Sequence, residues 1–133
     1  MPMGSKEKGS NAERELIHTF WATKQWTALR VAGSGSMKYP APDILASNNG
    51  VHLAIECKAT SARQQYLEKR EVKELVEFAK TAGARPLIAV RFNRTPWCFL
   101  NPDDLPATEK NYVVTPELAK RRGLTFEEIT KST

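Results

Sequence analysis

Apolar residues near the start of the chain recur at steps of three and four, which predicts an amphipathic helix. One face of this helix combines a carboxylate with four apolar side chains: Glu13, Leu16, Ile17, Phe20 and Trp21. Ser10 or Asn11 can cap the helix, so residues 1–9 are predicted to form a mobile N-terminal arm. A carboxylate on an apolar face is unusual. Glu13 is therefore interpreted as a first-turn partner of the helix dipole or as a residue that points into a polar site.

Alternating apolar and polar residues in the middle of the chain predict a β-hairpin with strands over 43–47 and 51–59. The Asn-Asn-Gly sequence at 48–50 tolerates the positive φ angles of a tight turn. One set of side chains in the second strand is expected to enter the core: Val51, Leu53, Ile55 and Cys57. The opposite face then carries His52, Ala54, Glu56 and Lys58. This register brings Asp43 and Glu56 together at the end of the hairpin that lies away from the turn.

The elements around the hairpin are predicted from the same patterns. A strand over 27–32 precedes a glycine- and serine-rich loop at 33–36, and the polar segment 60–67 is predicted to be a loop. A helix over 68–82 follows, and Gly83 ends it. Its apolar positions are expected to be buried: Val72, Leu75, Val76 and Ala79.

Two more strands are predicted over 85–92 and 97–100, and short helices over 115–122 and 125–130. The order of these elements indicates an α/β fold with a mixed sheet of about five strands flanked by helices. The length of 133 residues fits one domain over 1–133, in which the C-terminal segment 106–133 is the least defined part.

Composition and charge narrow the class of protein. Hydrophobic residues make up 41% of the chain, which is typical of a globular protein, and the net charge of +5 favours nucleic acid, and then anionic membrane, as a partner. Cys57 and Cys98 form no C-x-x-C pair, and the chain has two histidines, which argues against structural zinc. The sequence has no secretory leader and no apolar run near the ~20 residues that span a bilayer, so a cytoplasmic location is expected.

The predicted hairpin places two carboxylates and an ammonium group at one end of the sheet. Asp43 and Glu56 offer oxygen ligands of the kind that Mg²⁺ prefers, and Lys58 can orient a water molecule or stabilise developing charge. Such a site fits metal-assisted hydrolysis of a phosphodiester. The alternative is a solvated sheet face, on which a Glu-x-Lys pair is very common.

The distribution of acidic residues favours the metal site. Between Leu16 and Leu67 the only acidic residues are Asp43 and Glu56, although the chain has 15. A surface that approaches phosphates is expected to lack other acids, since each would repel the DNA backbone.

These residues also lie in a recognisable pattern. Asp43 with Glu56-Cys57-Lys58 resembles the PD-(D/E)-x-K nuclease signature. The wider pattern is more specific, with KGSNAERE at 8–15, RVAGSGS at 30–36, PDI at 42–44 and IECK at 55–58. Together these segments are similar to the archaeal-type Holliday junction resolvases, the Hjc/Hje family, over about residues 6 to 105.

The resemblance implies a restriction-endonuclease-like sheet and a Mg²⁺-dependent endonuclease, in which Mn²⁺ can replace Mg²⁺. The implied catalytic residues are Glu13, Ser34, Asp43, Glu56 and Lys58, with Ser36 as an alternative to Ser34. The implied metal ligands are the carboxylates of Glu13, Asp43 and Glu56 and the backbone carbonyl of Cys57.

The resemblance further implies a homodimer that cuts opposite strands of a four-way junction and leaves 5′-phosphates, with no organic cofactor and no membrane partner. The residues expected to contact DNA are Lys6, Lys8, Arg14, Arg30, Ser36, Lys38, Arg63 and Tyr66. At least two of the tryptophans Trp21, Trp26 and Trp97 are expected in the core or the dimer interface, with base stacking as the alternative. Two other functions fit the motif, namely a restriction- or repair-type nuclease and a non-catalytic DNA-binding module.

Overall fold

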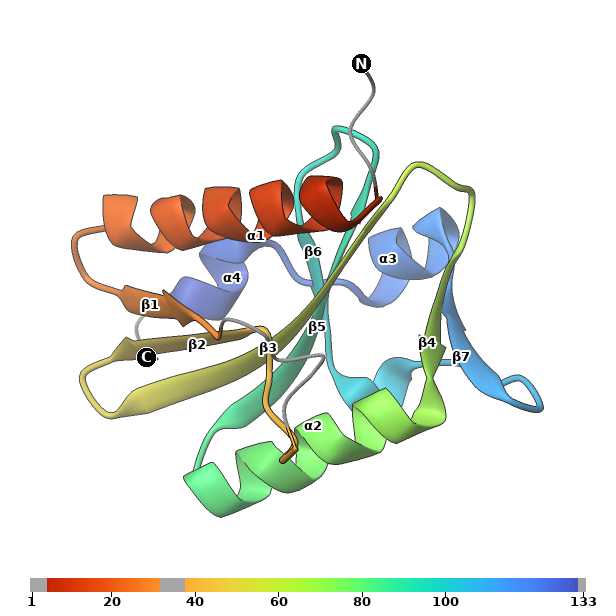
Figure 1. Ribbon diagram of the computed structural model, residues 1–133. Coiled ribbons are helices and arrows are strands. Elements are labelled where there is room, and N and C mark those ends of the chain that lie inside the picture. Colours follow the sequence, from red (N-terminus) through yellow and green to blue (C-terminus); the bar gives the residue numbers. More distant parts are fainter. Residues whose placement is uncertain (1–4, 32–37, 132–133) are drawn as a thin grey trace.

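The structure, a computed structural model that describes residues 5–31 and 38–131, consists of a central β-sheet with helices on both faces (Figure 1). The sheet contains β1 (Thr27–Arg30), β2 (Ile44–Asn48), β3 (Val51–Thr60), β5 (Arg85–Phe92) and β6 (Cys98–Leu100). The helices are α1 (Ser5–Ala22), α2 (Lys69–Ala82), α3 (Pro116–Arg122) and α4 (Phe126–Thr130), with a short 3₁₀ turn η2 (Pro102–Asp104). A separate two-stranded ribbon pairs β4 (Gln65–Glu68) with β7 (Asn111–Val114).

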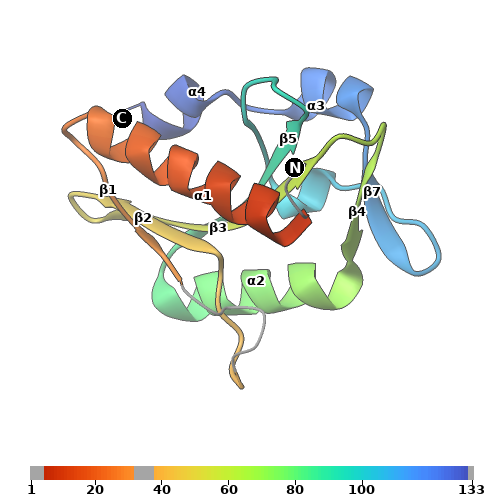
Figure 2. The same cartoon turned by 45° about the horizontal axis from the view of Figure 1, so that its top comes forward.

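The strand order β1-β2-β3-β5-β6 combines antiparallel and parallel pairing, which confirms the predicted mixed five-stranded sheet. β3 and β5 are parallel, and α2 lies in the connection between them, whereas the other neighbouring pairs in this sheet are antiparallel. A parallel pair needs such a crossover because its two strands start at the same edge of the sheet. Figure 2 shows α1 and α2 on opposite faces of the sheet and the β4–β7 ribbon at one end.

The β2–β3 hairpin has the predicted turn and register. Asn49 and Gly50 have φ angles of 46° and 90°, and Ile44 lies opposite Ile55. Both faces of β3 are buried in its middle, with Leu53 and Ile55 in one core cluster and Ala54 in the other. The prediction that Val51 enters the core is wrong, because this residue lies beside the turn and its side chain is 52% exposed.

Two apolar clusters hold the helices against the sheet. On one face Leu16 and Phe20 of α1 pack with Ile129 of α4, and the rings of Phe20 and Phe126 meet edge to face at 4.9 Å. On the other face α2 buries Val72, Leu75 and Ala79 as predicted. Val76 and Trp21 are 39% and 51% exposed, so the predicted apolar faces of α2 and α1 are wider than the buried ones.

The N-terminal prediction is wrong in its boundary. Helix α1 begins at Ser5, so Ser10 and Asn11 lie inside it and residues 5–9 are not an arm. Lysine and glutamate at 6–8 have good helix propensity, which outweighs the capping preference of Ser10. The rest of the predicted arm, residues 1–4, lies outside the described residues.

The segment 60–67, predicted to be a loop, contains most of β4, because Gln65 to Glu68 pair with the unpredicted strand β7. The C-terminal helices α3 and α4 are confirmed, with the side chains of Thr115 and Thr125 as N-caps. Of the helices in the described part of the chain, none is long and apolar enough to cross a membrane.

Candidate active site

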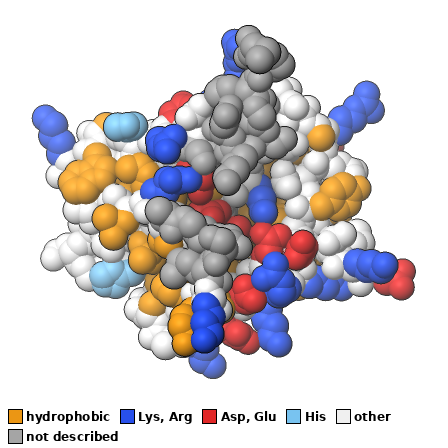
Figure 3. All heavy atoms as spheres, viewed as in Figure 1, with side chains coloured by type: hydrophobic (Ala, Val, Ile, Leu, Met, Phe, Trp, Pro, Cys, Tyr) orange, Lys and Arg blue, Asp and Glu red, His pale blue; other side chains and the backbone are white. Residues whose placement is uncertain are grey.

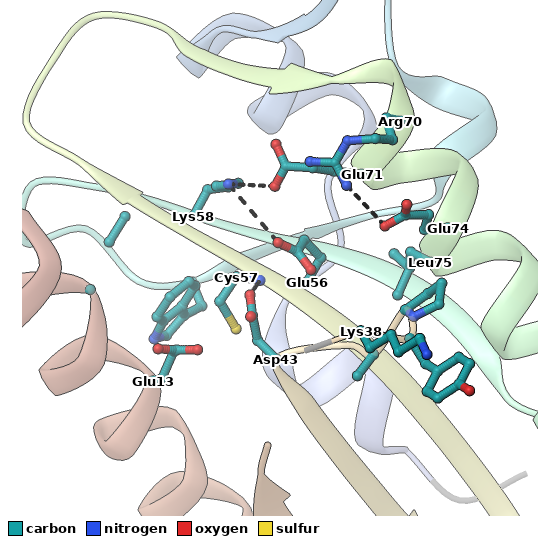
Figure 4. Close-up of a pocket in the computed structure, with 16 residues that line it drawn as sticks. Glu13, Lys38, Asp43, Glu56, Cys57, Lys58, Arg70, Glu71, Glu74 and Leu75 are labelled. Carbon is teal, nitrogen blue, oxygen red and sulfur yellow. Dashed lines mark hydrogen bonds and ion pairs between the residues drawn. The ribbon is translucent and has the colours of Figure 1, made fainter. Parts of the chain in front are cut away.

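A cleft of about 500 Å³ opens where the ends of several elements meet. Its lining comes from three elements and two connecting segments: α1, β3 and α2, the segment 38–43 before β2, and Trp97 of the β5–β6 connection. Figure 3 shows acidic side chains gathered in the middle of this face, with Lys and Arg side chains around them. In the close-up Glu56 and Glu71 lie beside Lys58, and Asp43 and Glu13 follow toward α1 (Figure 4).

Asp43 continues the hairpin by one residue beyond β2. Its backbone N–H donates to the carbonyl of Ile55 at 3.0 Å, and its Oδ2 accepts from the backbone N–H of Cys57 at 2.8 Å. The second bond fixes the carboxylate beside β3. The predicted approach of Asp43 to Glu56 is present, since the two carboxylates lie close enough that, besides burial, the charge of Asp43 raises the pKa of Glu56.

Glu13 reaches the site from α1, on the other face of the sheet from α2. Its Oε2 lies 3.6 Å from Nε of Arg30, and its carboxylate, that of Asp43 and the Cys57 Sγ have ligand atoms within 4.8 Å of one another. Burial and the charge of Asp43 raise the pKa of Glu13. Of the two roles predicted for Glu13, the structure shows the one in which it points into a polar site.

Glu56 and Lys58 point to the α2 face of the sheet, as their alternation with Cys57 predicts. Burial, followed by the charge of Asp43, raises the pKa of Glu56 to about 9. The Lys58 Nζ lies 3.9 Å from Glu56 Oε2 but donates to Oε2 of Glu71 at 2.8 Å. Burial lowers the pKa of Lys58, but the hydrogen bond to Glu71 and the nearby carboxylates outweigh it, so this pKa is raised.

The donor set fits a hard divalent cation. Carboxylates this close repel one another when ionised, and the raised pKa values of Glu13 and Glu56 express that repulsion together with burial. A cation relieves both effects because it adds positive charge among oxygen ligands. Glu56 is not part of the close group of Glu13, Asp43 and Cys57, since its carboxylate turns toward Lys58 (Figure 4).

The Cys57 side chain packs against the α1-side core cluster, as predicted. Its Sγ also lies in the close group with the carboxylates of Glu13 and Asp43, which the sequence did not predict. Burial and the charge of Asp43 raise the pKa of the thiol, which keeps it neutral without a metal.

The residues predicted to contact DNA differ in how exposed their side chains are. Lys38, Arg14, Arg63 and Tyr66 are exposed, and the Lys38 ammonium lies 5.8 Å from the centre of the Tyr39 ring at the edge of the cleft. Arg30 is half-buried beside Glu13. The side chains of Lys6 and Lys8, and all of Ser34 and Ser36, lie outside what the structure describes.

The sequence patterns did not predict the contribution of α2. Arg70, Glu71 and Glu74 line the cleft, so it is richer in acids than the segment 16–67 suggested. The Glu-x-x-Glu spacing of Glu68 and Glu71 is a helix-start signal, but it carries no information on the contact with β3. Of the tryptophans, Trp26 is buried as expected, and Trp97 packs against the α1-side core cluster and also lines the cleft. Among the described residues, none is a hydrogen-bond partner of the Trp97 Nε1.

The mixed sheet with Asp43, Glu56 and Lys58 at the end of its central hairpin defines a nuclease of the PD-(D/E)-x-K class. The comparisons with known proteins are more specific. The sequence model described as "Archaeal holliday junction resolvase (hjc)" matches residues 4–133, and the chain belongs to that family.

Named relatives extend over nearly the whole chain. It is 38% identical over 130 residues to the crossover junction endodeoxyribonuclease Hjc of Archaeoglobus fulgidus, a match that covers 92% of this chain and 95% of the relative. It is 33% identical to the Hjc protein of Methanocaldococcus jannaschii (92% and 86% covered) and 32% identical to the Hje protein of Saccharolobus solfataricus (93% and 96% covered). The solved structure of Archaeoglobus fulgidus Hjc superposes with a TM-score of 0.83 at 36% identity and covers 91% of this chain and 98% of its own.

Proposed function

We propose that this protein is a structure-selective DNA endonuclease that resolves four-way junctions by Mg²⁺-dependent hydrolysis of phosphodiester bonds. The observation that carries the proposal is the convergence of Glu13, Asp43, Glu56 and Lys58 on one cleft of a family member's fold. The relatives' name, crossover junction endodeoxyribonuclease, supports branched DNA as the substrate.

The proposed metal ligands are the carboxylates of Glu13, Asp43 and Glu56 and the backbone carbonyl of Cys57. Mg²⁺ is the proposed ion, and Mn²⁺ would replace it, because both accept carboxylate and carbonyl oxygens. When bound, the ion supplies Lewis-acid chemistry, which acidifies a coordinated water and stabilises charge on the phosphoryl group.

The chain's own residues position the reactants. Lys58 lies beside Glu56 with its ammonium directed into the cleft, where it would orient the attacking water or stabilise negative charge on the phosphate. Asp43 is held by the backbone N–H of Cys57, so its carboxylate needs no rearrangement to act as a ligand. Ser34 is proposed to contact the scissile phosphate, with Ser36 as the alternative.

The DNA is proposed to lie along the exposed cations around the cleft. Lys38, Arg14 and Arg63 are exposed and supply positive charge, and Tyr66 offers an exposed ring for a base or sugar. Lys6, Lys8, Arg30 and Ser36 are proposed to complete this surface. A homodimer is also proposed, which would present two such clefts to opposite strands and so make paired symmetric cuts.

The test is cleavage of a four-way junction, a flap and a linear duplex in parallel, at matched salt concentration with Mg²⁺. The proposal predicts that the junction is cut much faster than the other two. Equal cutting of flap or duplex would favour a restriction- or repair-type nuclease. Binding without cleavage in Mg²⁺ or Mn²⁺ would favour a non-catalytic module.

A further inference from the structure

Among the described residues, the shortest polar contact of Lys58 is with a residue outside the sequence signature. Its Nζ donates to Oε2 of Glu71 at 2.8 Å, whereas the nearest oxygen of Glu56 is 3.9 Å away. Glu71 comes from the first turn of α2, across the cleft from β3 (Figure 4). The catalytic lysine is therefore oriented by a helix that packs on the sheet, and not by its own strand alone.

The Glu71 carboxylate is itself held in place. Its second oxygen, Oε1, accepts from the backbone N–H of Glu68 at 3.2 Å, where α2 begins. Both oxygens are thus engaged, and the side chain is 22% exposed. The hydrogen bond from Lys58 and its charge outweigh burial and lower the pKa of Glu71, which keeps this carboxylate ionised.

A lysine side chain has a flexible stem of four carbons, so the position of its ammonium group is poorly defined unless a partner restrains it. At Lys58 the restraint comes from two carboxylates on different elements, and Glu71 is the closer one. Glu56 is a proposed metal ligand, so its oxygens are shared with the ion, whereas Oε2 of Glu71 remains available to the lysine.

We propose that Glu71 is a positioning residue that holds the Lys58 ammonium in the geometry needed for phosphodiester cleavage. This inference rests on the proposed function, because Lys58 has a catalytic role only if the protein is a nuclease. Glu71 contacts neither DNA nor metal in this proposal and acts through Lys58. The competing interpretation is that Glu71 serves only as a helix cap.

The variant Glu71→Gln separates the two interpretations. Glutamine still accepts the hydrogen bond from the backbone of Glu68, so the start of α2 is kept. The ionic partner of Lys58 is lost. A matched control is Glu74→Gln, which removes a carboxylate one turn later in the same cleft, where Glu74 pairs with Arg70 and not with Lys58.

The experiment is single-turnover cleavage of a four-way junction in Mg²⁺ by the full chain, with junction affinity measured in Ca²⁺. For Glu71→Gln we expect the cleavage rate at saturating enzyme to fall about ten-fold or more, because misplacement of a catalytic group slows the step that it assists. Junction affinity and the melting temperature should stay within error of the parent. Glu74→Gln should cut at the parent rate.

A parent-like rate in Glu71→Gln overturns the inference, as does a loss confined to junction affinity or an equal loss in Glu74→Gln. These outcomes leave the proposed function intact, since the parent still cuts. Failure of the parent chain to cut any junction overturns the proposed function, and the role of Glu71 with it.

Discussion

Replacement of Glu56 by glutamine should make the metal-free protein more stable at neutral and alkaline pH. Burial and the charge of Asp43 raise the pKa of Glu56 from 4.5 to about 9. Between these values the folded state retains a proton that the unfolded state has lost. The folded state thus binds more protons, and the free energy of unfolding falls as the pH rises from about 4.5 to about 9.

The size of the effect follows from the width of that window. One pKa unit corresponds to about 1.4 kcal/mol, so the two pH units from 5 to 7 account for at most about 3 kcal/mol. Glutamine removes the ionisable group but can still donate a hydrogen bond to Asp43. The variant should therefore show a flatter dependence on pH and should exceed the parent in stability at pH 8.

The assay is urea unfolding in EDTA at pH 5, 7 and 8, monitored by circular dichroism, for the parent, Glu56→Gln and the control Glu74→Gln. The control removes a carboxylate of the same cleft and should follow the parent. Parallel pH profiles for the parent and Glu56→Gln would refute the reasoning, since burial and repulsion would then not act on Glu56.

Three further predictions concern the metal, the DNA surface and the core. Mg²⁺ binding at pH 7 should release about one proton per site, because Glu56 must ionise to become a ligand. Calorimetry in two buffers of different ionisation enthalpy measures this release. No release is expected for Glu56→Gln. Lys38→Ala should weaken junction binding and reduce, by about 1, the slope of the logarithm of the binding constant against the logarithm of the salt concentration. The cleavage rate at saturating enzyme should not change. An unchanged slope would mean that Lys38 does not contact the phosphates. Phe20→Ala should cost about 3–5 kcal/mol in urea unfolding, because Phe20 is fully buried against Trp26 and Phe126; a cost below 1 kcal/mol would show that this core is loosely packed.

Short-range sequence patterns predicted those elements whose structure depends mainly on neighbouring residues. The Asn-Asn-Gly turn and the alternation of β3 predicted the hairpin, and the hairpin register predicted that Asp43 meets Glu56. Gly83, in a left-handed conformation with φ of 70°, ends α2 where the sequence indicates. The unusual carboxylate of Glu13 on an apolar face was a correct signal for a polar site.

The contributions that depend on long-range packing could not be predicted. β4 and β7 are only four residues long, and each is defined by pairing with the other strand across more than forty residues of chain. The contact between Glu71 and Lys58 depends on how the crossover helix docks on β3, which no spacing in the sequence specifies. The segment 16–67 does contain few acidic residues, but the fold brings Glu71 and Glu74 to the same cleft from outside that segment.

The central claim is that Asp43 is a ligand in a metal-dependent site that cuts junction DNA, and strand-by-strand nicking of a synthetic four-way junction tests it most directly. Each strand is labelled in turn, and the parent and Asp43→Asn are compared in Mg²⁺ and in EDTA. We predict paired symmetric cuts in two opposite strands by the parent in Mg²⁺, no cuts in EDTA, and junction binding without cleavage by Asp43→Asn. Cleavage by Asp43→Asn at a rate near that of the parent, or full cleavage by the parent in EDTA, would contradict the claim.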